Sequence, residues 1–232
     1  MSYLNTGITK RAGDDDYDFV RQNVAPSVAG LGLAVPQYVI AKKVHALGPT
    51  AGENAENALK GMEAIWKKMG LERVKDHWSE EMFGPNFNSR SNTLNVTKDN
   101  LGILAHETGH AKNHASIKKL FGKPGVLAKH IMSGAGKFGS MLGSVGGSLA
   151  ALFGAEDDTV RNIGIAGSAA ALPQFAEEIV ASARGANMLR KLKAPMKSRL
   201  GAFVGLPAHL LAVAAPMTPW LGLKAYDKLK ED

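Results

Sequence analysis

Stretches of apolar residues alternate along the chain with polar segments, and most of these stretches have the spacing of α-helices. Residues 51–71 are the clearest amphipathic helix, since their apolar positions recur three or four residues apart and Gly70 is a suitable stop. The stretches over 24–41, 138–190 and 200–223 are richer in small and apolar residues. This pattern predicts a mainly α fold in which Gly/Ala-rich hydrophobic helices pack closely.

A short strand is expected between two of these helices. Residues 92–96 alternate polar and apolar side chains, which is the pattern of a half-buried strand. Thr97 or Asp99 can cap a helix that begins near Asn100. The segment 92–121 is therefore expected to form an edge strand followed by a helix.

The domain organisation predicted from these patterns is one unit over residues 24–223 between two polar tails, 1–23 and 224–232. The first tail carries an acidic run, which is unlike a cleavable signal peptide. Pro26 and Pro36 interrupt the apolar stretch 24–41, so a kinked membrane span, an in-plane helix and a buried core helix are all compatible with it.

Composition and charge limit the kinds of metal ligand and the kinds of binding partner that are possible. The chain has no cysteine, which excludes disulfides and thiolate metal ligands. Its net charge is +7, but the lysines and arginines are not interleaved with aromatic residues and match no nucleic-acid recognition motif. They cluster beside apolar stretches instead, as charges that flank a membrane do. We therefore expect membrane lipid, and not nucleic acid, as a partner.

The sequence His106-Glu107-Thr108-Gly109-His110 has the H-E-x-x-H spacing of a zinc-binding helix. Residues four apart on an α-helix lie on one face, about 6 Å apart along the axis, so both histidines can bind one ion. Glu107 can reach a water on that ion and act as its general base. The motif can also occur by chance, but here it lies among apolar and small residues, where histidines without partners would be costly.

A third metal ligand has to come from elsewhere in the chain. His114 shares the face of His106 but lies about 12 Å from it along the axis, too far for both to reach one ion at roughly 2 Å. The remaining candidates are His130, His209, Glu177 and Glu178.

The helical pattern over residues 173–190 favours Glu178, with Glu177 as the alternative one position away. Glu178 is followed by Ala181 and Ser182, whose small side chains allow two helices to approach closely. His209, within the apolar stretch 200–223, is interpreted as a polar residue paired with helix backbone, the alternative being that it faces the site.

Two segments resemble a known family. Residues 103–111, followed by an apolar hairpin and by Glu178-Ile-Val-Ala-Ser-Ala-Arg184, resemble the membrane-bound neutral zinc metallopeptidases of bacteria. They are more distantly similar to heat-shock membrane proteases and CAAX prenyl proteases, although Ser182 stands where the prenyl proteases have aspartate. The resemblance covers roughly residues 88–190. It implies a gluzincin site in which His106, His110 and Glu178 bind Zn²⁺ and Glu107 is the catalytic base.

These expectations describe a membrane-associated zinc endopeptidase acting on a peptide or protein substrate. Basic segments at 112–137 and 184–199 surround an acidic connection at 156–161, which places the site on the cytoplasmic side by the positive-inside rule. The alternative is a structural or membrane-interacting protein, for example of a phage virion, that keeps the zinc-binding scaffold without peptidase activity. A mean hydropathy of −0.10 is also compatible with a soluble, Gly/Ala-rich helical bundle.

Overall fold

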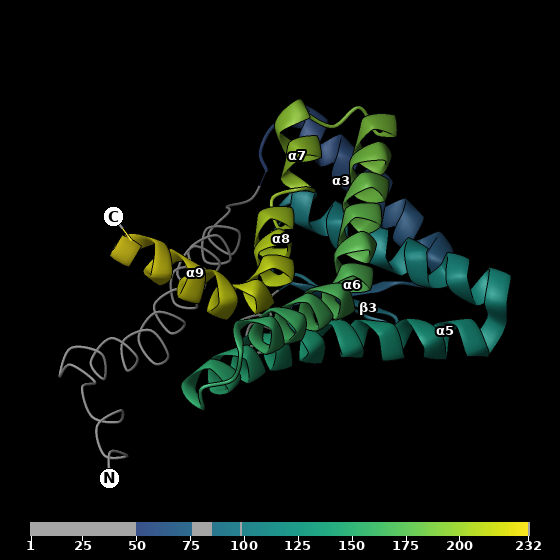
Figure 1. The fold of residues 1–232 in the computed structure, drawn as a ribbon. Helices are drawn as coiled ribbons and strands as arrows, with labels where there is room; N and C mark the ends of the chain where they lie inside the picture. Colours follow the sequence, from purple (N-terminus) through teal and green to yellow (C-terminus); the bar gives the residue numbers. More distant parts are fainter. Residues whose placement is uncertain (1–49, 76–84, 98, 232) are drawn as a thin grey trace, which may run out of the picture. The chain divides into compact units, whose positions relative to one another are not determined.

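The computed structural model describes residues 50–75, 85–97 and 99–231, which are mainly helical (Figure 1). By internal contacts these residues fall into two compact units. The motif unit contains the described residues up to 137 together with 171–211, and the hairpin unit contains 138–170 and 212–231. The predicted tail 1–23 and apolar helix 24–41 lie outside the described residues, and the single unit over 24–223 stays a prediction.

Helix α3 (Glu53–Met69) corresponds to the amphipathic pattern over 51–71. It buries Ala55, Ala58, Met62 and Trp66 on one face, against a core that includes Leu94, Leu104 and Leu189. Gly70 ends the helix in the left-handed conformation, with φ 63°.

A three-stranded sheet lies in the motif unit, where one strand was expected. Its strands are β1 (Glu72–Val74), β2 (Asn86–Asn88) and β3 (Thr93–Asn95), in the order β1-β3-β2. β3 pairs in parallel with β1 and antiparallel with β2. The prediction of an edge strand at 92–96 was therefore wrong in one respect, since this strand is central and β2 is at an edge of the described sheet.

Helix α5 (Leu101–Leu152) carries the H-E-x-x-H motif in its first turns. Its cap is Asn100, whose side-chain Oδ1 accepts a hydrogen bond of 3.1 Å from the N–H of Ile103, and not Thr97 or Asp99 as expected. Gly122 interrupts the helix with φ 61° and ψ −153°, a conformation that glycine adopts without strain. Figure 1 shows α5 changing direction, so that it has two arms within the motif unit.

Helix α6 (Asp157–Lys191) crosses the first arm of α5 with the two helix backbones in close contact. A Cβ on Gly109 would collide with the backbone of Ala181, and a Cβ on Gly185 would collide with the backbone of Ala105. Small residues at this crossing were expected from the sequence around Glu178. They bring the backbone of α6 directly against the H-E-x-x-H motif.

The hairpin unit contains residues 138–152 at the end of α5 and residues 157–170 at the start of α6, which also pack through small residues. Gly143 lies against Gly167, and Gly139 lies against Ala170, so these small residues let the two helices approach closely. Large apolar side chains on this hairpin are exposed, among them Phe138 at 64% and Phe153 at 82%.

The C-terminal part of the chain consists of α7 (Met196–Gly201), α8 (Leu206–Ala214), the 3-10 turn η2 (Ala215–Met217) and α9 (Thr218–Glu231). The residues expected as a polar tail from 224 continue α9. Among the described residues one helical stretch, Met196–Leu229, is long and apolar enough to cross a membrane by length and composition, since it contains an 18-residue window with a mean hydropathy of 1.7. This criterion is also met by core helices of soluble proteins.

Candidate metal centre

Three side chains of the motif unit converge on one point. His106 and His110 come from α5, and Glu178 comes from α6. The two imidazole Nε2 atoms lie 3.2 Å apart, and each lies 3.2 Å from Oε2 of Glu178. The three candidate ligand atoms lie within 4.8 Å of one another, so this group could hold a metal ion.

The other ring nitrogen of each histidine is held by a neighbouring group. Nδ1 of His106 lies 3.2 Å from the backbone carbonyl of Ala202 and 2.9 Å from the hydroxyl of Ser182. Because a carbonyl only accepts, Nδ1 donates to it, so a neutral His106 would present the lone pair of Nε2 to a metal ion. Nδ1 of His110 lies 3.1 Å from Oε1 of Glu177. Such outer contacts fix the tautomer and ring orientation of metal-binding histidines.

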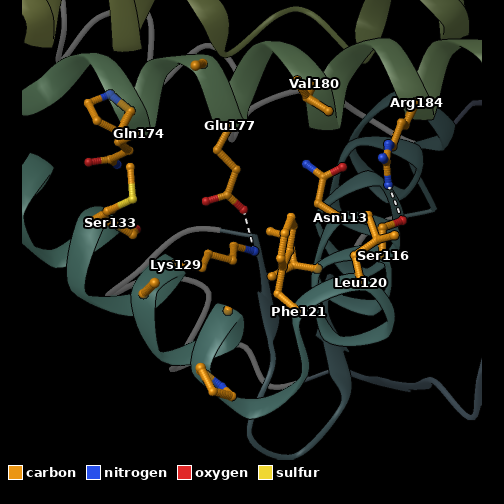
Figure 2. A pocket seen from close by; sticks show the side chains of 17 residues that line it. Asn113, Ser116, Leu120, Phe121, Lys129, Ser133, Gln174, Glu177, Val180 and Arg184 are labelled. Carbon is orange, nitrogen blue, oxygen red and sulfur yellow. Dashed lines mark hydrogen bonds and ion pairs between the residues drawn. The ribbon is translucent and has the colours of Figure 1, made fainter.

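Glu177 and Glu178 therefore take different positions. Glu178 points at both Nε2 atoms, whereas Oε1 of Glu177 contacts Nδ1 of His110 and lies 2.6 Å from Nζ of Lys129. Glu177 and Lys129 both line a largely apolar pocket of about 810 Å³ between α5 and α6. Figure 2 shows their ion pair among the side chains that line this pocket. In the same view Arg184 reaches the hydroxyl of Ser116 on the first arm of α5.

The charges of the group balance without a metal ion. Burial raises the pKa of Glu178, but hydrogen bonds from His106 and His110 outweigh it and hold this pKa well below its ordinary value. Burial lowers the pKa of His110, but the carboxylates of Glu177 and Glu178 outweigh burial and raise it to about 10. A proton on His110 thus offsets the charge of Glu178, while Lys129 pairs with Glu177.

Glu107 lies beside this group with only 7% of its surface exposed. Burial raises the pKa of its carboxyl, and the positive charges of His106 and His110 oppose the rise. The backbone N–H of Phe87 in β2 donates a hydrogen bond to the carboxylate. Strand β2 therefore orients the residue expected to act as the base.

A cleft of about 370 Å³ opens onto these residues. His106, Glu107, His110 and Glu178 line it together with Asn86, Phe87 and Ser89 from β2 and the turn after it. The edge strand that faces the cleft is therefore β2, and not the strand at 92–96 that was expected there.

His209 also lines the cleft, with Nε2 at 3.5 Å from Oε2 of Glu178. The favoured interpretation, in which it pairs only with helix backbone, was wrong, because α8 directs its imidazole at the metal-binding group. His130 lines the cleft without joining the group of three. His114 lies apart, with its ring against Phe87 and His130, as its distance along the helix predicted.

Comparison with known proteins gives no match, whether to a family model, a curated protein or a solved structure.

Proposed function

We propose that the chain is a zinc-dependent peptide hydrolase whose metal ligands are His106, His110 and Glu178. Two neutral imidazoles and one carboxylate are the donor set of catalytic zinc sites, which leave a fourth position open for water. The observation that carries the proposal is the convergence of these three groups on a cleft whose wall includes the buried Glu107.

The residues of the cleft have separate tasks. When bound, Zn²⁺ would supply Lewis acidity, which lowers the pKa of a water molecule and polarises a carbonyl. Glu107 accepts the proton of the attacking water, and the N–H of Phe87 keeps the carboxylate oriented. His209 supports the oxygen on which negative charge develops, because its imidazole lies at the cleft beside Glu178.

A peptide substrate is favoured by the position of β2. Within the described residues, β2 pairs with β3 on one side only, and Asn86 and Phe87 line the cleft. An extended peptide can add to such an edge as a further strand, with its backbone hydrogen-bonded to β2. That placement would bring a peptide carbonyl close to Glu107.

Membrane association is part of the proposal. The exposed apolar residues of the hairpin unit would be covered by lipid at a membrane surface, and the apolar part of Met196–Leu229 can add to such a contact. The basic residues at 112–137 and 184–199 favour the cytoplasmic side for the metal centre, by the positive-inside rule.

The test compares the purified wild-type chain with the Glu107→Gln variant, both loaded with zinc. We expect wild type to cleave quenched peptides from a mixed-sequence library and Glu107→Gln to lose cleavage while it keeps one zinc per chain. Gln preserves the shape of the side chain but cannot accept the proton. Equal cleavage by the two proteins would disprove the mechanism.

A second candidate function is favoured by the exposed apolar face of the hairpin unit, which includes Phe138, Met141, Leu142, Val145 and Leu149. In this alternative the chain perturbs a membrane or belongs to a virion, and the metal only stabilises the fold. Leakage of dye from liposomes, by wild type and Glu107→Gln alike and without any peptide cleavage, would support it.

A further inference from the structure

A second pocket of about 900 Å³ lies next to the metal cleft, within the motif unit. Its floor and walls come from the turn after β2 and from both arms of α5 on either side of Gly122. We call it the basic pocket, and its lining residues are Asn88, Ser89, Arg90, His114, Lys118, Lys123, Val126, Leu127 and His130.

The basic pocket is strongly cationic. Arg90, Lys118 and Lys123 line it together with two histidines, and none of its lining residues is an aspartate or glutamate. Among the described residues, none of these three cations forms an ion pair with a carboxylate. Burial and the positive charges of Lys129, His130 and Lys118 lower the pKa of His114, which agrees with a positive potential in the pocket.

The basic pocket and the metal cleft are neighbours that share two lining residues. Ser89 and His130 line both, and Nε2 of His130 lies 3.4 Å from the hydroxyl of Ser89 at their junction. Strand β2 runs along the two cavities, with Asn86 and Phe87 in the cleft and Asn88 in the basic pocket. A peptide that adds to β2 beside Glu107 would continue into the basic pocket.

We propose that the basic pocket binds acidic side chains of the peptide substrate, so that the preferred substrates carry aspartate or glutamate close to the cleaved bond. Carboxylates would pair with Arg90, Lys118 and Lys123, and the contiguous backbone would be held by β2. This inference rests on the proposed peptidase function for its cleavage arm. Its binding arm does not depend on that function, because none of the proposed metal ligands lines the basic pocket.

The cleavage arm uses three quenched peptides that are identical except for a pair of neighbouring residues, which are Glu-Glu, Gln-Gln or Lys-Lys. We expect kcat/KM for the Glu-Glu peptide to exceed that for Gln-Gln by about tenfold at low salt, since several partly exposed ion pairs add. The Lys118→Gln/Lys123→Gln variant should lose most of this preference. The Lys119→Gln variant is the matched control, because Lys119 is an exposed lysine on the same helix that does not line the pocket, and it should keep the preference.

The binding arm measures fluorescence anisotropy of the same labelled peptides with Glu107→Gln protein in EDTA. Tighter binding of Glu-Glu than of Gln-Gln, weakened in the Lys118→Gln/Lys123→Gln/Glu107→Gln variant, is the expected result even if no peptide is ever cleaved. Equal binding of the two peptides would overturn the inference, whether or not cleavage occurs. A single-stranded RNA oligonucleotide that binds more tightly than the Glu-Glu peptide would also overturn it, in favour of a nucleic-acid site.

Discussion

Trp66 donates a hydrogen bond of 2.8 Å from its indole Nε1 to the hydroxyl of Thr108, a residue inside the H-E-x-x-H motif. The hydroxyl in turn donates to the carbonyl of Leu104, at 2.7 Å. Both side chains are buried. Helix α3 therefore fixes the face of the motif that points away from the histidines.

Replacing Thr108 by valine should destabilise the fold by about 1–3 kcal/mol, because the buried indole N–H would lose its acceptor. The free energy of unfolding, measured by urea denaturation, checks this value. In a double-mutant cycle with Trp66→Phe, the loss in the double variant should be smaller than the sum of the two single losses. Strict additivity would show that the hydrogen bond contributes nothing.

Gly109→Ala should disrupt the metal centre through the helix crossing, although it adds only one methyl group. The new Cβ would meet backbone of Ala181, which cannot rotate away, so α6 has to shift and Glu178 moves with it. We expect a loss of stability of about 1–3 kcal/mol and weaker zinc binding by calorimetry. Gly185→Ala should behave in the same way, because its Cβ would meet backbone of Ala105.

Gly134→Ala is the control for both glycine variants. Gly134 lies in α5 within the motif unit, and a Cβ there would meet no atom within 4 Å. Alanine is the better helix former, so this variant should be as stable as wild type or up to about 1 kcal/mol more stable. A loss of stability equal to that of Gly109→Ala would mean that the crossing is not the cause.

Metal content should separate Glu178 from Glu177. Wild type is expected to hold about one zinc per chain, and Glu178→Ala should lose it. Glu177→Gln should retain zinc with an affinity lowered by about 10–100-fold, because Glu177 only orients His110. Elemental analysis and competition with a chelator measure both effects, with His114→Ala as the control that stays fully loaded. Retention of zinc by Glu178→Ala would exclude Glu178 as a ligand.

The ion pair between Arg73 and Asp99 should make a small contribution to the free energy of unfolding that is lost in acid. The hydrogen bond from Arg73, at 2.6 Å, holds the pKa of Asp99 below its ordinary value of 3.8, against a smaller opposing effect of burial. Because folding lowers this pKa, the stabilisation is complete above about pH 4 and is lost as the pH falls through the folded-state pKa.

Asp99→Asn should therefore reduce stability near neutral pH and have less effect in acid. The side chain of Asp99 is 47% exposed, so the loss should stay below about 1 kcal/mol. Urea denaturation of wild type and Asp99→Asn at pH 7 and pH 2.5 measures the difference. A gap between the two proteins that widened in acid would contradict the assignment.

Local sequence was enough to predict the elements that carry the metal-binding group. The spacing of His106 and His110 determines a common helix face, and the small residues after Glu178 indicated a close helix crossing. The amphipathic spacing over 51–71 identified α3. Each of these predictions depends on residues within a few helical turns of one another, where the geometry of the helix leaves little choice.

The features that the sequence did not predict depend on contacts between distant segments. Strand β2 is only three residues long, which is too short for a periodic pattern, and its position at the sheet edge follows from pairing with β3. His209 lies in an apolar stretch whose composition says nothing about its direction. Only the packing of α8 in the motif unit brings it to Glu178.

The motif unit is discontinuous in sequence, and this has a consequence for its synthesis. His110 and Glu178 are 68 positions apart, and residues 138–170 of the hairpin unit are made between them. While the ribosome is still translating this insert, the nascent chain carries two histidines that can bind zinc only loosely. Closing a loop of this length costs about 4 kcal/mol of chain entropy. Tight zinc uptake would therefore mark the moment at which α6 docks on α5, and a metal-sensitive dye could follow maturation of the chain in real time.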